Sequence, residues 1–174
     1  ETAQLDPGTI YGVCKVTCEN YLKVLQEGYD LKWTVLRLFG TYGAGHRPST
    51  FQGIVNIMLT QLLSGNRVVV KGSIDRKRDL IYVDDVLEAV VKVLKSPSAF
   101  GQILNIGTGQ AVTIKELIEK LCVALNKPID QTNIVEEEGT VGDPMNNVAD
   151  CSKANVILDF AAKYTIDEGL KTLV

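Results

Sequence analysis

The sequence predicts an α/β fold with a smaller α+β part, and three observations support this class. Residues 10–27 show helical apolar periodicity, and the β-rich, mostly apolar run 33–39 comes next, as in a helix–strand unit of a buried parallel sheet. Glycines follow this run and also the later run 102–106. Short strand-like runs then alternate with further amphipathic helices, without a repeat or a low-complexity tract.

Composition and charge exclude several classes of function. The 174 residues are 45% hydrophobic and 22% charged, with a formal net charge of −3, which is ordinary for a globular chain. This balance lacks the basic footprint of a protein that binds nucleic acid or anionic membranes. No apolar run approaches the ~18–20 residues of a membrane-spanning helix. We therefore expect no nucleic-acid or membrane partner and a cytoplasmic location.

The four cysteines are expected to be buried free thiols in a reducing compartment. Cys14 and Cys18 lie one helical turn apart, a spacing that would also suit a metal ion. No second pair of ligands accompanies them, and the single histidine, His46, is not near them in the sequence. We therefore expect no metal site.

Tyr11 and Lys15 form a candidate catalytic pair on the helix 10–27, which Thr9 is expected to cap and Gly28 to close. A separation of four residues places both side chains on one face, about 5–6 Å apart at Cβ. An ammonium beside a phenol favours the phenolate, which can exchange a proton with a substrate hydroxyl near neutral pH. The alternative is an ordinary helix start with a packed tyrosine and a solvated lysine.

The apolar side chains of helix 10–27 occupy more than one face, so this helix needs more than one neighbour. The glycine-rich segment 40–45 directly follows the strand 33–39. Ligands of open α/β sheets bind at this end of the strands, where glycine lets the backbone approach them closely. A plain turn is the alternative for this segment.

The remaining elements are short and are recognised by signals at their ends. Further helices are expected around 54–63 (closed by Gly65), and over 85–95, 114–125, 152–160 and 166–174. Their expected caps are Ser49 or Thr50, Asp84 or Asp85, Thr113, Ser152 and Thr165, of which Thr113 and Thr165 open capping boxes. Strands are expected at 67–71, 80–83, 102–106 and 134–135, with turns at 72–78 and 142–144.

Five segments together resemble the C-terminal half of the extended short-chain dehydrogenases/reductases, in the group of nucleotide-sugar epimerases and dehydratases. The resemblance covers essentially the whole chain, from residue 7 to residue 173. The segments are Tyr11-Gly12-Val13-Cys14-Lys15 with Glu19; Arg37-Leu38-Phe39-Gly40-Thr41-Tyr42-Gly43-Ala44-Gly45; Arg78-Asp79-Leu80-Ile81-Tyr82-Val83-Asp84-Asp85-Val86; Asn105-Ile106-Gly107; and Gly142-Asp143 with Ala149-Asp150 and Ser152-Lys153-Ala154.

The resemblance implies a fold and a division into parts. Residues 1–46 would form the C-terminal part of a Rossmann-like parallel sheet. Residues 47–174 would form mainly a small α+β substrate-binding domain, with strand 102–106 returning to the sheet. The N-terminal dinucleotide-binding half, with its glycine-rich turn and a catalytic Ser or Thr, is expected before residue 1. The given chain is therefore expected to be inactive alone.

The resemblance also implies site residues, a cofactor and partners. Tyr11 and Lys15 would be catalytic and would also contact NAD or NADP. The other implied cofactor contacts are Phe39, Gly40 and Thr41, and the implied nucleotide-sugar contacts are Tyr42, Arg78 and Asp143, with no metal. A homodimer would form through helix 10–27. For Arg78, a purely structural pair with Asp79 or Asp84 remains the alternative.

Three departures from the family's pattern concern the usual substrate contacts. Gly40 stands where the family usually has Asn, Thr140 where it often has Arg, and Arg76 where Gln is common. These departures favour an atypical substrate. A reductase of a small non-sugar carbonyl and a non-catalytic binding or regulatory homologue therefore remain as alternatives.

Overall fold

The computed structural model describes residues 1–49 and 51–174. Its helices are α1 (Ile10–Tyr29), α2 (Ile54–Ser64), α3 (Val83–Lys95), α4 (Ile114–Ala124), α5 (Ser152–Leu158) and α6 (Ile166–Lys171), with 3₁₀ turns at Pro97–Ala99 and Ile129–Gln131. Its strands are β1 (Thr34–Leu38), β2 (Gly40–Tyr42), β3 (Arg67–Lys71), β4 (Lys77–Arg78), β5 (Leu80–Tyr82), β6 (Gln102–Ile106), β7 (Val112–Thr113), β8 (Asn133–Glu137) and β9 (Asn146–Asn147).

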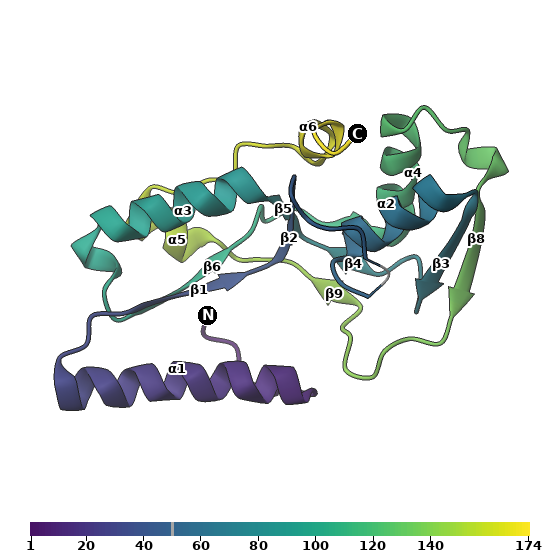
Figure 1. Ribbon diagram of the computed structural model, residues 1–174. Helices are drawn as coiled ribbons and strands as arrows, with labels where there is room; N and C mark the ends of the chain where they lie inside the picture. The colour runs from purple at the N-terminus through teal and green to yellow at the C-terminus, as the bar shows by residue number, and fades with distance from the viewer. Residues whose placement is uncertain (50) are drawn as a thin grey trace.

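A parallel pair of strands, β1 and β6, forms the Rossmann-like part of the fold. Thr34 lies opposite Gln102 and Leu38 opposite Ile106, so the predicted strand 102–106 pairs in parallel with the strand after α1. Helices α1 and α3 lie on opposite sides of this pair (Figure 1). A buried core packs between the β1–β6 pair on one side and helices α3 and α5 on the other. It includes Ile81, Leu104, Ile106 and Phe160. The α/β class with parallel strands is thus confirmed.

A second core lies in the other half of the molecule. Strand β3 pairs in parallel with β8, and β2 pairs in parallel with β5. Helices α2, α4 and α6 pack over these strands, and their contacts bury Met58, Leu62, Leu117, Leu121 and Leu170. The boundary expected between residues 46 and 47 stays a prediction, because this core also takes in Tyr42, which lies before it.

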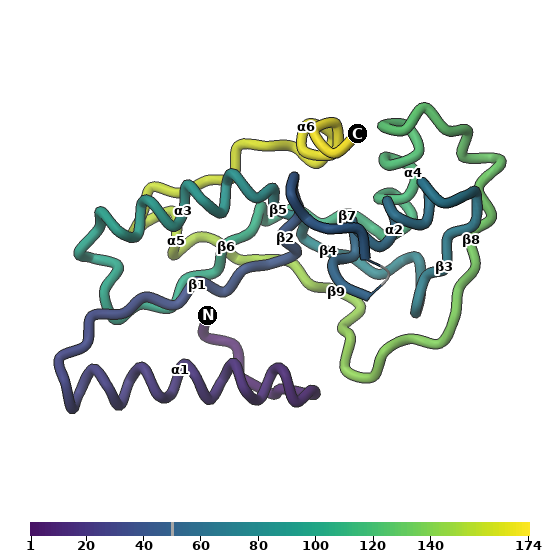
Figure 2. The backbone as a smooth tube through the Cα atoms, viewed as in Figure 1, coloured from purple at the N-terminus to yellow at the C-terminus, as the bar shows by residue number. Residues whose placement is uncertain are grey.

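A small three-stranded sheet, in the order β7-β4-β9, lies between the two halves and carries candidate site residues. Strand β4 is antiparallel to β7 and parallel to β9, with Arg78 opposite Asn147. After β8 the chain makes a long loop before it returns as β9 (Figure 2). Asp143 lies in this loop, so the return of the chain brings it to the arginines of β4.

Helix α1 is held to β1 mainly by an ion pair and leaves much apolar surface exposed. Glu19 accepts two hydrogen bonds from Arg37 of β1, at 2.8 and 2.7 Å. Only Glu19 of this helix is fully buried, and its exposed apolar side chains include Ile10, Val13, Tyr21, Val24 and Tyr29. The expectation that this helix needs further neighbours therefore matches its surface.

Capping signals are confirmed where they are purely local. The Thr9 hydroxyl accepts a hydrogen bond from the Gly12 amide at 3.1 Å. Thr113 and Thr165 each form a complete capping box with the Glu three residues later. The predicted closure of α1 at Gly28 is wrong, because the helix continues to Tyr29 and ends at Asp30, which adopts the left-handed conformation with φ 52°.

Other predicted caps are wrong because the side chains have different partners. The Ser49 hydroxyl accepts from the amides of Phe51 and Gln52, while α2 begins later, after Gly53; Thr50 lies outside the described residues. Helix α3 begins already at Val83, so Asp84 and Asp85 lie in its first turn. The Asp85 carboxylate instead accepts hydrogen bonds from the amides of Lys163 and Tyr164. Ser152 is the first residue of α5 and follows its cap, Cys151.

The cysteines are free thiols, but the expectation that they are buried is wrong for three of them. Only Cys122 is fully buried, Cys151 is half-buried, and Cys14 and Cys18 are exposed on α1. Cys14 and Cys18 are exposed for the same reason as the apolar residues of α1, because no other element of the described residues packs against this surface of the helix. No helix of the described residues combines the length and the apolar character that crossing a membrane would require.

Candidate functional site

Tyr11 and Lys15 lie together at the exposed start of α1. The Lys15 ammonium is 5.2 Å from the centroid of the Tyr11 ring, so the spacing of four residues brings the two side chains to one face. The Tyr11 side chain is not packed, because the residue is 72% exposed. This exposure contradicts the alternative of a packed tyrosine and leaves the phenol accessible to a ligand.

A cleft of about 440 Å³ separates the first half of α1 from β1. Tyr11, Lys15, Cys18, Leu22 and Arg37 are among the residues that line it. The cleft combines a phenol, an ammonium and apolar walls, a donor set that suits a hydroxyl-rich ligand with a flat ring. The chain therefore offers groups that fit the nicotinamide ribose end of NAD.

The Glu19–Arg37 pair fixes the position of this cleft. The Glu19 carboxylate and the Arg37 guanidinium form a bidentate contact in which both side chains are largely buried. The hydrogen bond from Arg37 lowers the pKa of Glu19, and the same bond raises the pKa of Arg37. Both groups therefore stay charged near neutral pH, and their contact fixes the position of α1 relative to β1.

The loop that carries Asp143 touches the residues just before Tyr11. A Cβ atom placed on Gly142 would lie 3.3 Å from the Gly8 carbonyl oxygen and 3.3 Å from Thr9 Cγ2. Gly142 also has a φ of +81°, which glycine adopts without strain. This close approach brings the start of α1 next to the predicted substrate contact Asp143.

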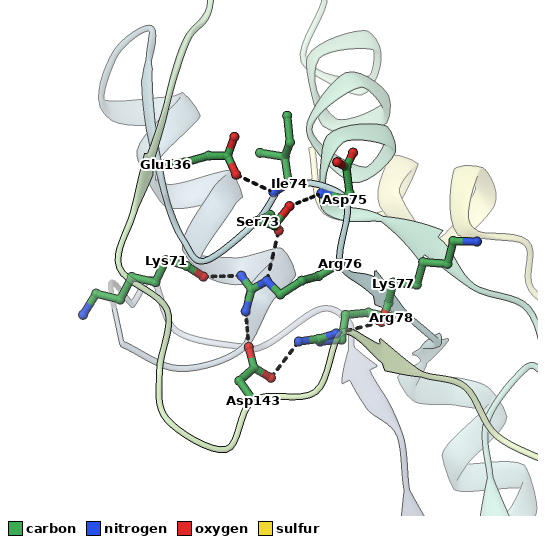
Figure 3. Close-up of polar contacts among 9 residues, drawn as sticks. All are labelled: Lys71, Ser73, Ile74, Asp75, Arg76, Lys77, Arg78, Glu136 and Asp143. Atoms are coloured by element: carbon green, nitrogen blue, oxygen red, sulfur yellow. Dashed lines mark hydrogen bonds and ion pairs between the residues drawn. The ribbon is translucent and has the colours of Figure 1, made fainter.

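Arg76, Arg78 and Asp143 form one charged cluster (Figure 3). Asp143 Oδ1 accepts a hydrogen bond from Arg78 at 2.6 Å, and its Oδ2 accepts one from Arg76. Arg76 also donates to the carbonyl oxygens of Lys71 and Ser73, and Arg78 to that of Lys77. Two guanidinium groups share one carboxylate, so the cluster carries one net positive charge.

The partners expected in the structural alternative for Arg78 are wrong, because Arg78 pairs with Asp143 rather than with Asp79 or Asp84. Asp79 is buried inside the loops around β6 and has its own set of donors. Its carboxylate accepts hydrogen bonds from the amides of Thr108, Gly109 and Ala149 and from the Thr108 hydroxyl. This carboxylate therefore ties the end of β6 to the segment before α5.

Phe39, Gly40 and Thr41 lie where β1 passes into β2. The Phe39 amide donates to the Ile106 carbonyl and the Gly40 amide to the Asp79 carbonyl, both at 3.0 Å. A Cβ atom on Gly40 would lie 2.8 Å from that Asp79 oxygen and 2.8 Å from Leu80 Cδ2. The position therefore has no room for the asparagine usual in the family, and the role of these residues as cofactor contacts stays a prediction.

Tyr42 is a core residue in this structure. It is 4% exposed, packs edge-on against Tyr82 with ring centroids 5.7 Å apart, and its burial raises the pKa of its phenol. It lines a separate cavity of about 210 Å³ together with His46, Asn56 and Thr172. Its predicted contact with the substrate stays a prediction. The other two predicted substrate contacts, Arg78 and Asp143, lie in direct contact with each other.

Arg76 is the member of the cluster that was not predicted as a site residue. The sequence does contain a signal for it, since Arg76 replaces a common glutamine while Thr140 replaces a frequent arginine. The gain and the loss of an arginine concern the same region, because Asp143 lies three residues after Thr140 and pairs with Arg76.

Comparison with known proteins identifies the family of this chain. Residues 1–107 match the NAD dependent epimerase/dehydratase family. The dTDP-4-dehydro-6-deoxyglucose reductase of Escherichia coli is 30% identical over 175 residues, covering 100% of this chain and 54% of that protein. The chain thus spans about half the length of the curated relatives it matches.

Two solved structures show the likeness in three dimensions. The UDP-glucose 4-epimerase of Thermotoga maritima, solved with UDP-glucose, is 31% identical with a TM-score of 0.85, over 93% of this chain and 51% of that one. The UDP-glucuronic acid 4-epimerase of Bacillus cereus, solved with UDP-glucuronic acid and NAD, is 25% identical with a TM-score of 0.88, over 96% and 52%. This chain belongs to the NAD dependent epimerase/dehydratase family.

Proposed function

We propose that this chain is part of an NAD(P)-dependent enzyme that acts on a nucleotide-activated sugar as an epimerase or dehydratase. The observation that carries the proposal is the exposed pair of Tyr11 and Lys15, 5.2 Å from ammonium to ring centroid, beside the loop of Asp143. The proposed proton-transfer pair thus lies at the start of α1, and the loop of the anion-binding arginine cluster contacts the residues just before it.

Tyr11 acts as the proton carrier. Its phenol oxygen takes a proton from a sugar hydroxyl, or returns one to a carbonyl oxygen. NAD or NADP, when bound, would supply the hydride acceptor or donor that balances this proton transfer. A positioned side chain of this kind contributes typically 10²–10⁴-fold to the rate. Its 72% exposure in this chain leaves the oxygen free to meet a substrate.

Lys15 has two tasks in this proposal. Its ammonium lies 5.2 Å from the centroid of the Tyr11 ring and holds the phenol in place by a cation–π contact. Its remaining donors hold the hydroxyls of the nicotinamide ribose, since an ammonium has three N–H bonds and no acceptor. The cleft between α1 and β1 gives this ribose a place next to both side chains.

Arg78 binds the diphosphate of the nucleotide sugar. A guanidinium can hold phosphate oxygens in a bidentate manner, and such charge-assisted bonds are about twice as strong as neutral ones. The net positive charge of the cluster of Arg76, Arg78 and Asp143 favours this ligand over a small neutral ketone. The cluster thus supports the sugar-nucleotide substrate over the alternative of a non-sugar carbonyl.

The assembled enzyme is proposed to be a homodimer that pairs through residues 10–27. The support is the row of exposed apolar side chains on α1, which one neighbour cannot cover completely. The four free thiols are in keeping with a cytoplasmic location, where thiols stay reduced.

The test replaces Tyr11 by phenylalanine in the intact protein. Tyr11→Phe is expected to lower turnover by about 10²–10⁴-fold at saturating substrate while the melting temperature is unchanged, because only one oxygen is removed from an exposed site. Tyr21→Phe on the same helix is the matched control and should keep its turnover. Turnover of Tyr11→Phe within a few-fold of the wild type would refute the catalytic assignment.

A product assay separates the proposed activity from its alternatives. The intact protein is incubated with NAD or NADP and either UDP- and dTDP-sugars or simple ketones. Conversion of the nucleotide sugars supports the proposal, whereas conversion of ketones alone supports the reductase of a non-sugar carbonyl. Binding of UDP without any turnover would identify a non-catalytic homologue.

A further inference from the structure

We propose that Arg76 is a positioning residue that permanently neutralises Asp143, so that Arg78 can exchange this carboxylate for the diphosphate of the substrate. The inference rests on the proposed function, since it concerns the same anion-binding cluster. It gives the two arginines different tasks, although both contact the same carboxylate.

Arg76 is fixed in the protein through every nitrogen of its guanidinium. Its Nε donates to the Ser73 carbonyl at 3.0 Å, one terminal nitrogen donates to the Lys71 carbonyl, and the other donates to Asp143 Oδ2. Its side chain is only 8% exposed. If Arg76 left this site, two carbonyl oxygens would lose their hydrogen-bond donor and an ion pair would break. Arg76 therefore stays in place when a ligand arrives.

The backbone around Arg76 is built for this fixed position. The turn between β3 and β4 wraps around the guanidinium, and Gly72 adopts a φ of +85° there. A Cβ atom on Gly72 would lie 3.0 Å from Arg76 Cζ. Glycine at this position therefore lets the turn close onto the guanidinium plane.

Arg78 is held less completely than Arg76. One terminal nitrogen donates to Asp143 Oδ1 at 2.6 Å and the other to the Lys77 carbonyl at 2.7 Å. The side chains of Arg78 and Asp143 are 13% and 31% exposed, against 8% for Arg76, and the Arg78–Asp143 hydrogen bond is the more exposed of the two that Asp143 accepts. A diphosphate arriving from solvent therefore encounters the Arg78–Asp143 contact, not the buried Arg76.

Charge explains why the second arginine is needed. If Asp143 had only Arg78, a diphosphate would have to draw Arg78 from a carboxylate left without a counterion next to the incoming negative charge. Such a carboxylate repels the ligand and loses its own hydrogen bonds. With Arg76 in place, Asp143 remains paired throughout the exchange, and Arg78 provides the net positive charge for the ligand.

The experiment measures UDP binding to four forms of the intact protein by calorimetry. They are the wild type, Arg76→Gln, Asp143→Asn and the double variant. We expect Arg76→Gln alone to weaken UDP binding about tenfold or more, in line with the loss of a charge-assisted contact. In the Asp143→Asn background the same change should alter binding by less than about twofold, because no carboxylate then needs neutralising.

Lys77→Gln is the matched control for loss of one positive charge. Lys77 is adjacent to both arginines in the sequence, but its side chain points away from Asp143 (Figure 3). This variant should bind UDP within about twofold of the wild type if the contact with Asp143, not general attraction, is decisive. An equal loss for Lys77→Gln and Arg76→Gln would refute the positioning role.

Three further outcomes decide the inference. An equal loss from Arg76→Gln in both backgrounds would show that Arg76 supports the turn or contacts UDP itself, and the proposal would be wrong. Wild-type protein that binds no UDP would overturn both this inference and the anion site of the proposed function. UDP binding that Arg76→Gln leaves unchanged would overturn this inference alone.

A second measurement covers a variant that fails to fold. Side-chain Nε–H signals of arginine are followed by NMR while UDP is added to the wild-type protein. The Arg78 signal should shift and the Arg76 signal should stay, because only Arg78 changes its partner. A shift of the Arg76 signal as large as that of Arg78 would contradict the division of tasks.

Discussion

At the scale of single residues, the packing around Gly40 gives a physical reason for its departure from the family pattern, which usually has Asn at this position. The sequence indicates only that an asparagine amide is missing and that a substrate contact has changed. In the structure, a Cβ at this position would lie only 2.8 Å from the Asp79 carbonyl oxygen and from Leu80 Cδ2. The replacement is therefore coupled to the close pairing of β2 with β5, and not only to the substrate.

Gly40→Ala is expected to destabilise the protein by about 1–3 kcal/mol, because the new methyl group overlaps a backbone oxygen that cannot move aside cheaply. Gly28→Ala is the matched control. It lies in α1 with no atom within 4 Å of the added carbon, and helix propensity predicts a gain of up to about 1 kcal/mol. Denaturant unfolding of both variants measures the difference, and equal stabilities would contradict the described packing of Gly40.

The cluster of Arg76, Arg78 and Asp143 marks how far single residues can be predicted from the sequence. Arg78 and Asp143 were singled out by their motifs, but nothing local predicts that Arg76 pairs with Asp143, 67 residues later. The pairing depends on the placement of β4 beside β9 and on the long loop after β8. Pairs of this kind follow from tertiary structure and not from sequence spacing.

At the scale of elements, the predictions that succeeded rest on local chemistry. The caps Thr9, Thr113 and Thr165 each use a hydroxyl and an amide within the same turn, so sequence alone is sufficient to place them. The caps expected at Asp84 or Asp85 failed because the carboxylate of Asp85 is used by the loop before α6. Tertiary partners therefore outweigh cap propensity where a charged side chain is buried.

The ion pair between α1 and β1 leads to a prediction about pH. Glu19→Gln is expected to lower the free energy of unfolding by about 2 kcal/mol near neutral pH, because the buried bidentate contact is lost. The pKa of Glu19 is lowered in the folded protein from its ordinary 4.5. Its contribution is therefore present above this value and is lost as the pH falls through the lower folded pKa.

Denaturant titrations at several pH values between 3 and 7 test this prediction. The difference between the wild type and Glu19→Gln should shrink as the pH falls. Glu88→Gln is the control, since Glu88 pairs with an exposed lysine and solvent screens the pair. Its effect should be smaller at every pH, and a difference for Glu19→Gln that does not change with pH would contradict the assigned cause.

The exposed face of α1 leads to a prediction about assembly. Val24→Asp in the intact protein is expected to turn the proposed dimer into a monomer, because a carboxylate would have to be buried in an apolar interface. Val123→Asp is the control, since Val123 is similarly exposed but lies on α4. Light scattering at micromolar concentration reads the mass, and a wild-type monomer would refute the dimer itself.

At the scale of the whole molecule, the candidate site collects residues from distant parts of the chain. Tyr11 and Lys15 come from α1, Arg76 and Arg78 from β4 and the turn before it, and Asp143 from the loop before β9. The Glu19–Arg37 ion pair holds α1 to β1, and the close approach of Gly142 to Gly8 joins the loop of Asp143 to the segment before α1. The motifs predicted these segments separately, whereas the fold is needed to place the loop of Asp143 against the residues just before Tyr11.

The last prediction is that residues 1–174 alone bind neither NAD nor NADP. Pyrophosphate recognition in this fold uses free backbone amides of a glycine turn at a helix N-terminus. The glycine turn after β6 cannot supply them, because the amides of Thr108 and Gly109 already donate to the Asp79 carboxylate. The Gly40 amide is likewise used, by the Asp79 carbonyl. A fluorescence titration of this chain with both dinucleotides checks the prediction. Saturable binding tighter than about 1 mM, roughly −4 kcal/mol, would show that the pyrophosphate site lies within these residues.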